Sequence, residues 1–108
     1  MTPIGDFIRG HTEAIILSIL EKEDSYGYKI NQTIEKISQG ELLLTEATMY
    51  SVFKRLEKNE FIQSYWQEGT NNVNRKYYSI TPLGKSYLKE HKHSWYKFSN
   101  MLNQFLNN

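Results

Sequence analysis

The sequence predicts a mainly α-helical protein with one β-hairpin, arranged as a winged helix-turn-helix domain with an added C-terminal helix. Three observations point to this class. Helical apolar periodicity recurs in three stretches before residue 60, two runs rich in aromatic and β-branched residues flank a polar turn between 61 and 80, and a heptad-spaced stretch follows Pro82. We expect the winged helix-turn-helix domain over residues 1–80 and the added helix over 81–108.

Length and composition fit one globular domain. The chain has 108 residues, of which 39% are hydrophobic and 23% charged, and it has no cysteine. A disulfide framework, a thiolate zinc site and a cysteine nucleophile are therefore excluded. The N-terminal residues lack the basic start and long apolar core of a signal peptide, and the longest apolar run, residues 14–17, is too short to span a bilayer. We expect a cytoplasmic protein that does not enter the membrane.

Two helices are predicted before residue 41. The first runs from Ile4 to Lys22, and its apolar residues become denser toward the end, which indicates a core position. Ser25 is a good N-cap for the second helix, from Tyr26 to about Gln39, with Gly40 as its C-cap.

A third helix, from Thr45 to Asn59, has two different faces. Met49, Phe53 and Leu56 recur on one face, and Thr45 is a plausible N-cap. Small hydroxyls early in a helix and cations later suit a DNA major groove, where the first residues reach base edges and the rest meet phosphate. An ordinary surface helix is the alternative.

The pattern then changes to that of a hairpin, with strands at 61–68 and 75–80 around the turn GTNNVN. Arg75 and Lys76 lie near its tip, where a wing meets the phosphate backbone or the minor groove. The alternative is a hairpin that only covers the core. Charge supports the first reading, because residues 1–53 carry four cations against eight anions, whereas residues 54–108 carry nine against four.

A last helix begins at Thr81 and Pro82, which are a good N-cap and first helical residue. Along it an apolar seam follows heptad spacing, which usually pairs with another helix. We expect a homodimer held by this seam, either helix to helix or against the first helix of the partner; packing against its own domain is the alternative. The seam consists of Leu88, His91, Trp95, Phe98, Leu102 and Phe105.

Three segments resemble the PadR family of bacterial transcriptional regulators: RGHTEAIILSILEKEDSYGYKI, LTEATMYSVFKRLEKNEFIQSYW and RKYYSITPLGKSYL. The single C-terminal helix is similar to that of the smaller PadR subfamily. The resemblance implies a homodimeric repressor that binds a pseudo-palindromic operator in double-stranded DNA. It places family motifs on Tyr26–Tyr28, on Thr48 and Tyr50, and on Arg75–Tyr78. The position of Trp95 is similar to that of a tryptophan lining a drug site in a multidrug repressor of the subfamily, which implies release by an aromatic effector.

The candidate site residues fall into three sets. The DNA-binding set is Tyr26, Tyr28, Thr45, Glu46, Thr48, Tyr50, Ser51, Lys54, Arg55, Arg75 and Lys76. The dimer set is the seam above. The set for a flat aromatic ligand between two protomers is Trp95, Phe7, Ile8 and Phe98.

No catalytic or metal-binding motif is present, so we expect no enzyme, no metal and no cofactor. His91 and His93 stand two residues apart on a helix and cannot hold one ion together, and His11 is expected to be a packing or polar residue. The alternative function is a protein-interaction module that keeps a winged-helix frame without reading DNA. The cations near the third helix and the hairpin favour DNA.

Overall fold

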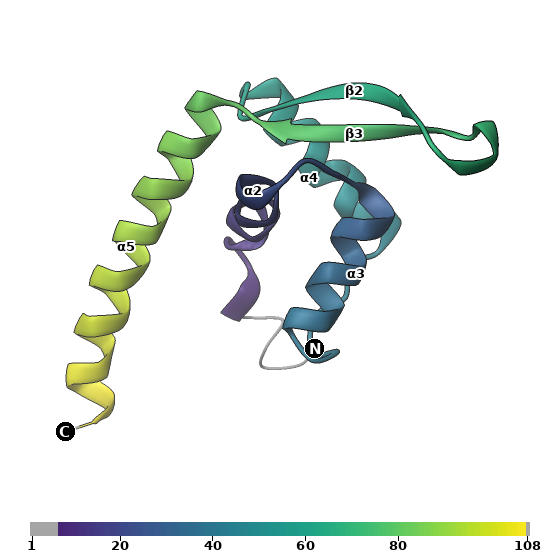
Figure 1. Ribbon diagram of the computed structural model, residues 1–108. Coiled ribbons are helices and arrows are strands. Elements are labelled where there is room, and N and C mark those ends of the chain that lie inside the picture. The colour runs from purple at the N-terminus through teal and green to yellow at the C-terminus, as the bar shows by residue number, and fades with distance from the viewer. Residues whose placement is uncertain (1–6, 108) are drawn as a thin grey trace.

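The computed structural model describes residues 7–107. Three helices and a small sheet form a compact body, from which a long last helix extends (Figure 1). The helices are α2 (Thr12–Lys22), α3 (Gly27–Ile37), α4 (Glu46–Lys58) and α5 (Pro82–Leu106). The strands are β1 (Ser25–Tyr26), β2 (Ile62–Glu68) and β3 (Asn74–Ile80), with a short 3₁₀ turn, η1 (Thr70–Asn72), between the last two. The predicted class, helices with a winged hairpin and a C-terminal helix, is confirmed.

The expected first helix is interrupted. A turn precedes α2, in which the His11 amide donates to the Ile8 carbonyl at 2.9 Å and Gly10 has a φ of +90°. That φ lies in the left-handed region, which glycine tolerates. A residue in this conformation interrupts a right-handed helix. The prediction of one helix from Ile4 was wrong at this turn, and residues 4–6 lie outside the described residues.

Ser25 is not the N-cap that the sequence suggested. It forms the two-residue strand β1 with Tyr26, antiparallel to Tyr77 and Tyr78 of β3. Tyr26 stands at the N-cap of α3 and makes no side-chain cap bond. A long-range strand pairing has therefore overridden the local capping preference, because the backbone of Ser25 is committed to the sheet.

The sheet has three strands in the order β1-β3-β2, one more than the expected hairpin. The register runs from Ile62 opposite Ile80 to Glu68 opposite Asn74. Side chains alternate between the two faces. The inner face carries Tyr78, which is 4% exposed and stacks on Phe53 with 4.1 Å between ring centroids.

The core lies between α2, α3, α4 and the inner face of the sheet. Its fully buried large side chains are Ile16, Leu17, Leu20, Ile30, Val52, Leu56 and Leu88. Helix α4 buries the three residues that the sequence predicted, Met49, Phe53 and Leu56, and also Val52. Burial of this face fixes the direction in which the opposite, polar face of α4 points.

Helices α3 and α4 end with the same hydrogen-bond pattern. The Gly40 amide donates to Glu35 O at 2.8 Å after α3, and the Phe61 amide donates to Leu56 O at 2.9 Å after α4. The preceding residue adopts a positive φ in each case, +54° at Gln39 and +61° at Glu60. This is the Schellman arrangement. Gly40 therefore helps to end α3, as expected. It does so from the C″ position, because Gln39 is the C′ residue.

The last helix begins directly after β3, with no linker between them. Thr81 accepts from the Gly84 amide at 3.0 Å and donates to Glu60 O at 2.6 Å, so it caps α5 and ties it to the end of α4. Of the residues in α5, only Gly84 and Leu88 are buried. The rest of the helix runs away from the body (Figure 1), which gives the molecule extents of 58 × 30 × 21 Å.

Candidate nucleic-acid interface

The exposed face of α4 is the centre of the candidate interface. Thr45 caps the helix as predicted, because its Oγ1 accepts from the Thr48 amide at 3.1 Å. Its hydroxyl also donates to Thr48 Oγ1 at 2.9 Å. The Thr48 hydroxyl therefore keeps its own proton free to donate to a base edge. Four more residues of the predicted DNA-binding set are exposed on α4, and among residues 7–107 none of the four makes an ion pair: Glu46, Tyr50, Ser51 and Lys54.

Asn31 of α3 positions the start of α4, a role that the sequence did not indicate. Its Nδ2 donates to Leu44 O at 2.8 Å, and its Oδ1 accepts from Leu44 N at 3.3 Å. Leu44 is 8% exposed and immediately precedes the cap residue Thr45. The Asn31 side chain thus holds both backbone groups of Leu44, just before α4 begins. We call α4 the recognition helix from here on. A polar residue inside a helical pattern gives no sign of such a partner 13 positions away.

Arg55 differs from the other cations of α4. Its Nε donates to Glu13 Oε1 of α2 at 2.9 Å, and the Glu13 side chain is only 23% exposed. The side chain is therefore held toward the first helix of the body. This separates Arg55 from the group formed by Thr48, Ser51 and Lys54, although the sequence placed them together.

The hairpin, called the wing from here on, carries its two cations on opposite faces. Arg75 and Lys76 are adjacent in β3, and neighbouring side chains of a strand alternate. Arg75 Nη1 donates to the Tyr26 hydroxyl at 3.0 Å, and its guanidinium lies 4.6 Å from the centroid of that ring. Lys76 lies on the other face, with its ammonium 5.7 Å from the Tyr78 ring centroid. Both side chains are half-buried, so neither extends freely from the tip.

A row of tyrosines crosses the outer face of the sheet. Tyr26, Tyr77 and Tyr65 stand side by side in the register of β1, β3 and β2. Ring centroids are 5.2 Å apart for the first pair and 5.7 Å for the second. The Tyr65 hydroxyl donates to Asp24 Oδ2 at 2.7 Å, and this bond is the largest cause raising the pKa of Tyr65. The row was missed from sequence because it depends on the pairing of β1 with β3.

Tyr28 and Tyr50 complete the predicted DNA-binding set. Both side chains are largely exposed, at 70% and 64%. The Tyr28 hydroxyl accepts from Gln32 Nε2 at 3.2 Å, one turn along α3. Each ring is therefore accessible to a partner.

The seam of α5 divides into two parts. Leu88 is buried in the body, and His91 is half-buried. Farther along, Trp95, Phe98 and Phe105 are 46%, 49% and 73% exposed, and Leu102 is half-buried. The first part of the seam thus packs against its own domain, as the alternative reading had it, and the second part is left uncovered in the single chain.

The residues predicted for an aromatic ligand lie on two segments, α5 and the turn before α2. Trp95 and Phe98 are neighbours, with ring centroids 6.2 Å apart. Phe7 is 75% exposed, and Ile8 lines a hollow with Ile15, between α2 and α3. Trp95 and Phe98 are not among the residues that line this hollow.

Two histidines join the start of α2 to α5. His11 Nδ1 and His91 Nε2 are 3.0 Å apart, so one neutral ring donates to the other. The rings meet edge to face, and His11 makes a similar contact with Trp95 at 5.3 Å. Burial, and next the charge of His11, lower the pKa of His91. His11 is thus a partly buried polar residue, as predicted.

Within residues 7–107, no three histidine, aspartate or glutamate side chains come together as metal ligands would. In the same part of the chain, no helix combines the length and apolarity needed to cross a membrane.

Comparison with known proteins gives a consistent result. The model of the family described as "Transcriptional regulator PadR-like family" matches residues 16–90. An uncharacterized protein of Lysinibacillus sphaericus is 42% identical over 101 residues, which cover 94% of this chain and 93% of that protein.

Solved structures of transcriptional regulators superpose on this chain over most of its length. A transcriptional regulator from Clostridium thermocellum superposes with a TM-score of 0.84 at 43% identity, over 93% of this chain and 97% of the other. A PadR family transcription regulator from hypervirulent Clostridium difficile superposes with a TM-score of 0.77 at 40% identity, over 90% and 99%.

Proposed function

The chain belongs to the PadR-like family of transcriptional regulators and is a DNA-binding regulator, and from this premise we propose that it works as a homodimeric repressor on a pseudo-palindromic operator. The exposed face of α4 would lie in the major groove, and the wing would contact the adjacent backbone. In a two-fold dimer the half-sites would be about one DNA turn, roughly 34 Å, or a multiple of it apart. The proteins of this family are described as transcriptional regulators, a class distinct from enzymes.

The observation that carries this proposal is the division of α4 into two faces. Its apolar face is buried, so Thr48, Ser51 and Lys54 are held on the opposite, exposed face. Hydroxyls in the first turns suit base edges, and an ammonium farther along suits phosphate. Because Arg75 is already bonded to Tyr26, we assign Lys54 and Lys76 the larger part of the backbone contacts.

The test is DNA binding as a function of salt, measured by fluorescence anisotropy on the protein's own promoter region. We expect Lys54→Ala and Lys76→Ala each to weaken binding to all sequences and to reduce the salt slope by about one. Ser51→Ala should instead reduce discrimination between operator and unrelated DNA. Lys89→Ala, on α5, is the matched control and should leave the slope unchanged. No preference for the promoter fragment in the wild-type protein would favour the interaction module.

An effector site is a second part of the proposal. We infer that a planar aromatic compound binds between two protomers against Trp95, because this ring is 46% exposed and lies beside Phe98 on the uncovered part of the seam. Stacking adds about 0.5 to 1.5 kcal/mol per aromatic pair to the burial of apolar area. A ligand alters repression only if it binds the DNA-competent and incompetent dimers with different affinity.

Tryptophan fluorescence provides the test of the effector site. Trp66→Phe is made first, so that only Trp95 reports. Titration with a planar bisbenzimide dye should then quench the emission, with a dissociation constant of tens of micromolar or tighter, roughly −6 kcal/mol or more favourable. Equal dye binding by the Trp95→Ala protein would contradict the assignment.

A further inference from the structure

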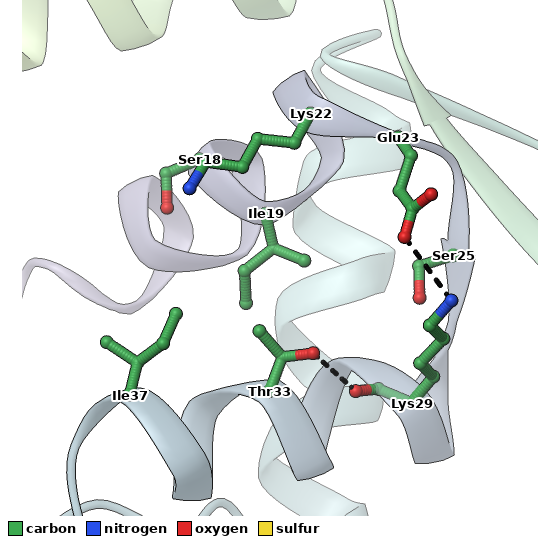
Figure 2. Close-up of a pocket in the computed structure, with 8 residues that line it drawn as sticks. All are labelled: Ser18, Ile19, Lys22, Glu23, Ser25, Lys29, Thr33 and Ile37. Carbon is green, nitrogen blue, oxygen red and sulfur yellow. Dashed lines mark hydrogen bonds and ion pairs between the residues drawn. The ribbon is translucent and has the colours of Figure 1, made fainter.

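A hollow of about 370 Å³ lies between α2 and α3, beside β1 and away from the exposed face of α4 (Figure 2). Its size is in the range of small-molecule sites. Its walls combine hydroxyls, charges and apolar side chains. The lining residues are Ser18, Ile19, Lys22, Glu23, Ser25, Lys29, Thr33 and Ile37.

Three hydroxyl groups line the hollow, and their hydrogen bonds differ. Ser18 donates to Ile15 O at 2.6 Å, and Thr33 donates to Lys29 O at 2.9 Å (Figure 2). Ser25 is 2% exposed, and its Oγ has no hydrogen-bond partner among residues 7–107. A buried hydroxyl without a partner costs free energy, so native proteins rarely keep one without a use. Ser25 is therefore the one hydroxyl of this wall that the described residues leave without a partner.

The charges around the hollow leave one positive charge unbalanced. Lys29 Nζ is 3.3 Å from Glu23 Oε1, so these two side chains neutralise each other. Lys22 has no ion pair among residues 7–107. A monoanion would balance this charge, whereas the second charge of a dianion would have no unpaired cation in the wall to balance it.

The rest of the wall is apolar. Ile19 points into the middle of the hollow, and Ile37 closes the end opposite Ser25 (Figure 2). Ile37 is 70% exposed in the single chain. A ligand that covered it would remove apolar surface from water, which favours binding. The hollow thus has a polar end at Ser25 and Lys29 and an apolar end at Ile37.

We propose that this hollow binds a small monocarboxylate with a short apolar chain. The carboxylate accepts from the Ser25 hydroxyl and from the Lys29 ammonium, which has donors beyond the one facing Glu23. Lys22 supplies the balancing charge, and the chain lies on Ile19 and Ile37. The site is separate from the uncovered seam at Trp95 and does not depend on the proposed dimer.

The site is placed where a ligand would act on the wing. Ser25 belongs to β1, and its backbone partner is Tyr78 of β3. A carboxylate bonded to Ser25 therefore connects the end of α2, the start of α3 and the wing strand. A ligand that binds only this arrangement would stabilise it, and the stabilisation would grow with the logarithm of the ligand concentration above the dissociation constant.

The experiment is a titration of the full chain with hexanoate, followed by ¹⁵N–¹H chemical shifts. We expect the shift changes to concentrate on the amides of Ile19, Ser25, Lys29 and Ile37. Ser25→Ala and Lys22→Met should each bind hexanoate at least about tenfold more weakly, the loss expected for one charge-assisted hydrogen bond or balancing charge. Ser18→Ala is the matched control and should bind as the wild type does, because that hydroxyl already has a partner.

Stability without ligand separates a binding role from a structural one. Ser25→Ala removes a buried hydroxyl that has no partner, so its melting temperature should equal or exceed that of the wild type. Lys22→Met changes an exposed side chain and keeps the fold in any case. A lower melting temperature of Ser25→Ala would assign the hydroxyl a structural role and overturn its assignment to a ligand.

Two further titrations decide the ligand class. Hexanol has the same chain without the charge, and inorganic phosphate has charge without the chain. Hexanol binding as tightly as hexanoate, or phosphate binding in its place, would overturn the proposal. So would the absence of shift changes up to about 50 mM hexanoate, a concentration that saturates even a site of millimolar affinity.

Discussion

At the scale of single residues, polar side chains inside the body determine how the DNA-reading surface is held. Asn31 satisfies both backbone groups of Leu44, and Glu13 holds Arg55 of α4 against α2. Neither contact is part of a helix or strand ladder. Each connects residues far apart in the sequence, so the position of α4 depends on a few specific hydrogen bonds as well as on apolar burial.

Asn31→Ala is expected to weaken both stability and DNA binding. Removal of the amide leaves the half-buried N–H and C=O of Leu44 without their partner, which costs about 1 to 3 kcal/mol of unfolding free energy. Urea unfolding measures this loss, and anisotropy measures DNA affinity. Glu35→Ala, an exposed residue one turn farther along α3, is the control. Equal stability of the two variants would show that the Leu44 contact contributes little.

The pair of His11 and His91 predicts a pH dependence of stability. Because burial lowers the pKa of His91, the unfolded chain binds the proton more readily than the folded one. The contribution of neutral His91 to the free energy of unfolding is therefore fully present above the pKa of histidine in the unfolded chain, about 6.5. It is lost as the pH falls below that value. We expect His91→Gln to lose less stability than the wild type between about pH 7.5 and pH 5.5 in urea titrations.

His93→Gln is the matched control for this experiment, because His93 is an exposed residue on the same helix. It should keep the pH dependence of the wild type. A wild-type profile in the His91→Gln protein would instead assign the acid sensitivity to other groups.

At the scale of elements, the junction of β3 and α5 depends on Gly84. A Cβ added at this position would overlap the carbonyl oxygen of Phe61 and lie 2.8 Å from Ile80 Cγ1. Gly84→Ala should therefore destabilise the protein by about 1 to 3 kcal/mol, although alanine is the better helix former. Thermal unfolding measures the effect. Lys85→Ala, one residue along, should change stability by less than about 0.5 kcal/mol.

Much at this scale follows from local sequence signals. Thr45 and Thr81 cap α4 and α5 as expected, because a threonine hydroxyl satisfies the nearest free amides without help from the rest of the fold. Ser25 carries the same local signal, yet its backbone pairs with Tyr78 more than 50 residues away. The need for glycine at position 84 is equally hidden, since it arises from a carbonyl in another segment.

In the candidate DNA-binding site too, some features follow from local sequence and others depend on tertiary contacts. The exposed face of α4 could be predicted because it is the complement of a periodic apolar face. The orientations of Arg55 and Arg75 could not, because their partners, Glu13 and Tyr26, are set by tertiary contacts. Charge counts treat these arginines as free cations, whereas the fold gives each of them a local partner.

At the scale of the whole molecule, the uncovered seam of α5 should hold a dimer together. Phe98→Glu would place a charge among apolar side chains that are buried only on association, so we expect monomers at micromolar concentration. Sedimentation velocity measures the change from the dimer that we expect for the wild type. Asn100→Glu introduces the same charge two residues away, off the seam, and should remain dimeric. A dimer in both variants would locate the interface elsewhere.

The close approach of Gly84 to the Phe61 carbonyl, together with Thr81, leaves no flexible joint between the wing and α5. Each residue inserted into α5 between Leu88 and Trp95 would turn everything beyond it by about 100° and advance it by about 1.5 Å. Insertions of about 7, 11 or 18 residues bring the rotational phase back to within about 20°. The part of α5 beyond the insertion can therefore move along the helix axis only in discrete steps, the smallest of about 10 Å, which is the rise of seven residues. If such dimers bind DNA, related proteins with insertions in α5 would bind operators whose half-site spacings differ by discrete amounts, and the helical repeat of α5 would set those amounts.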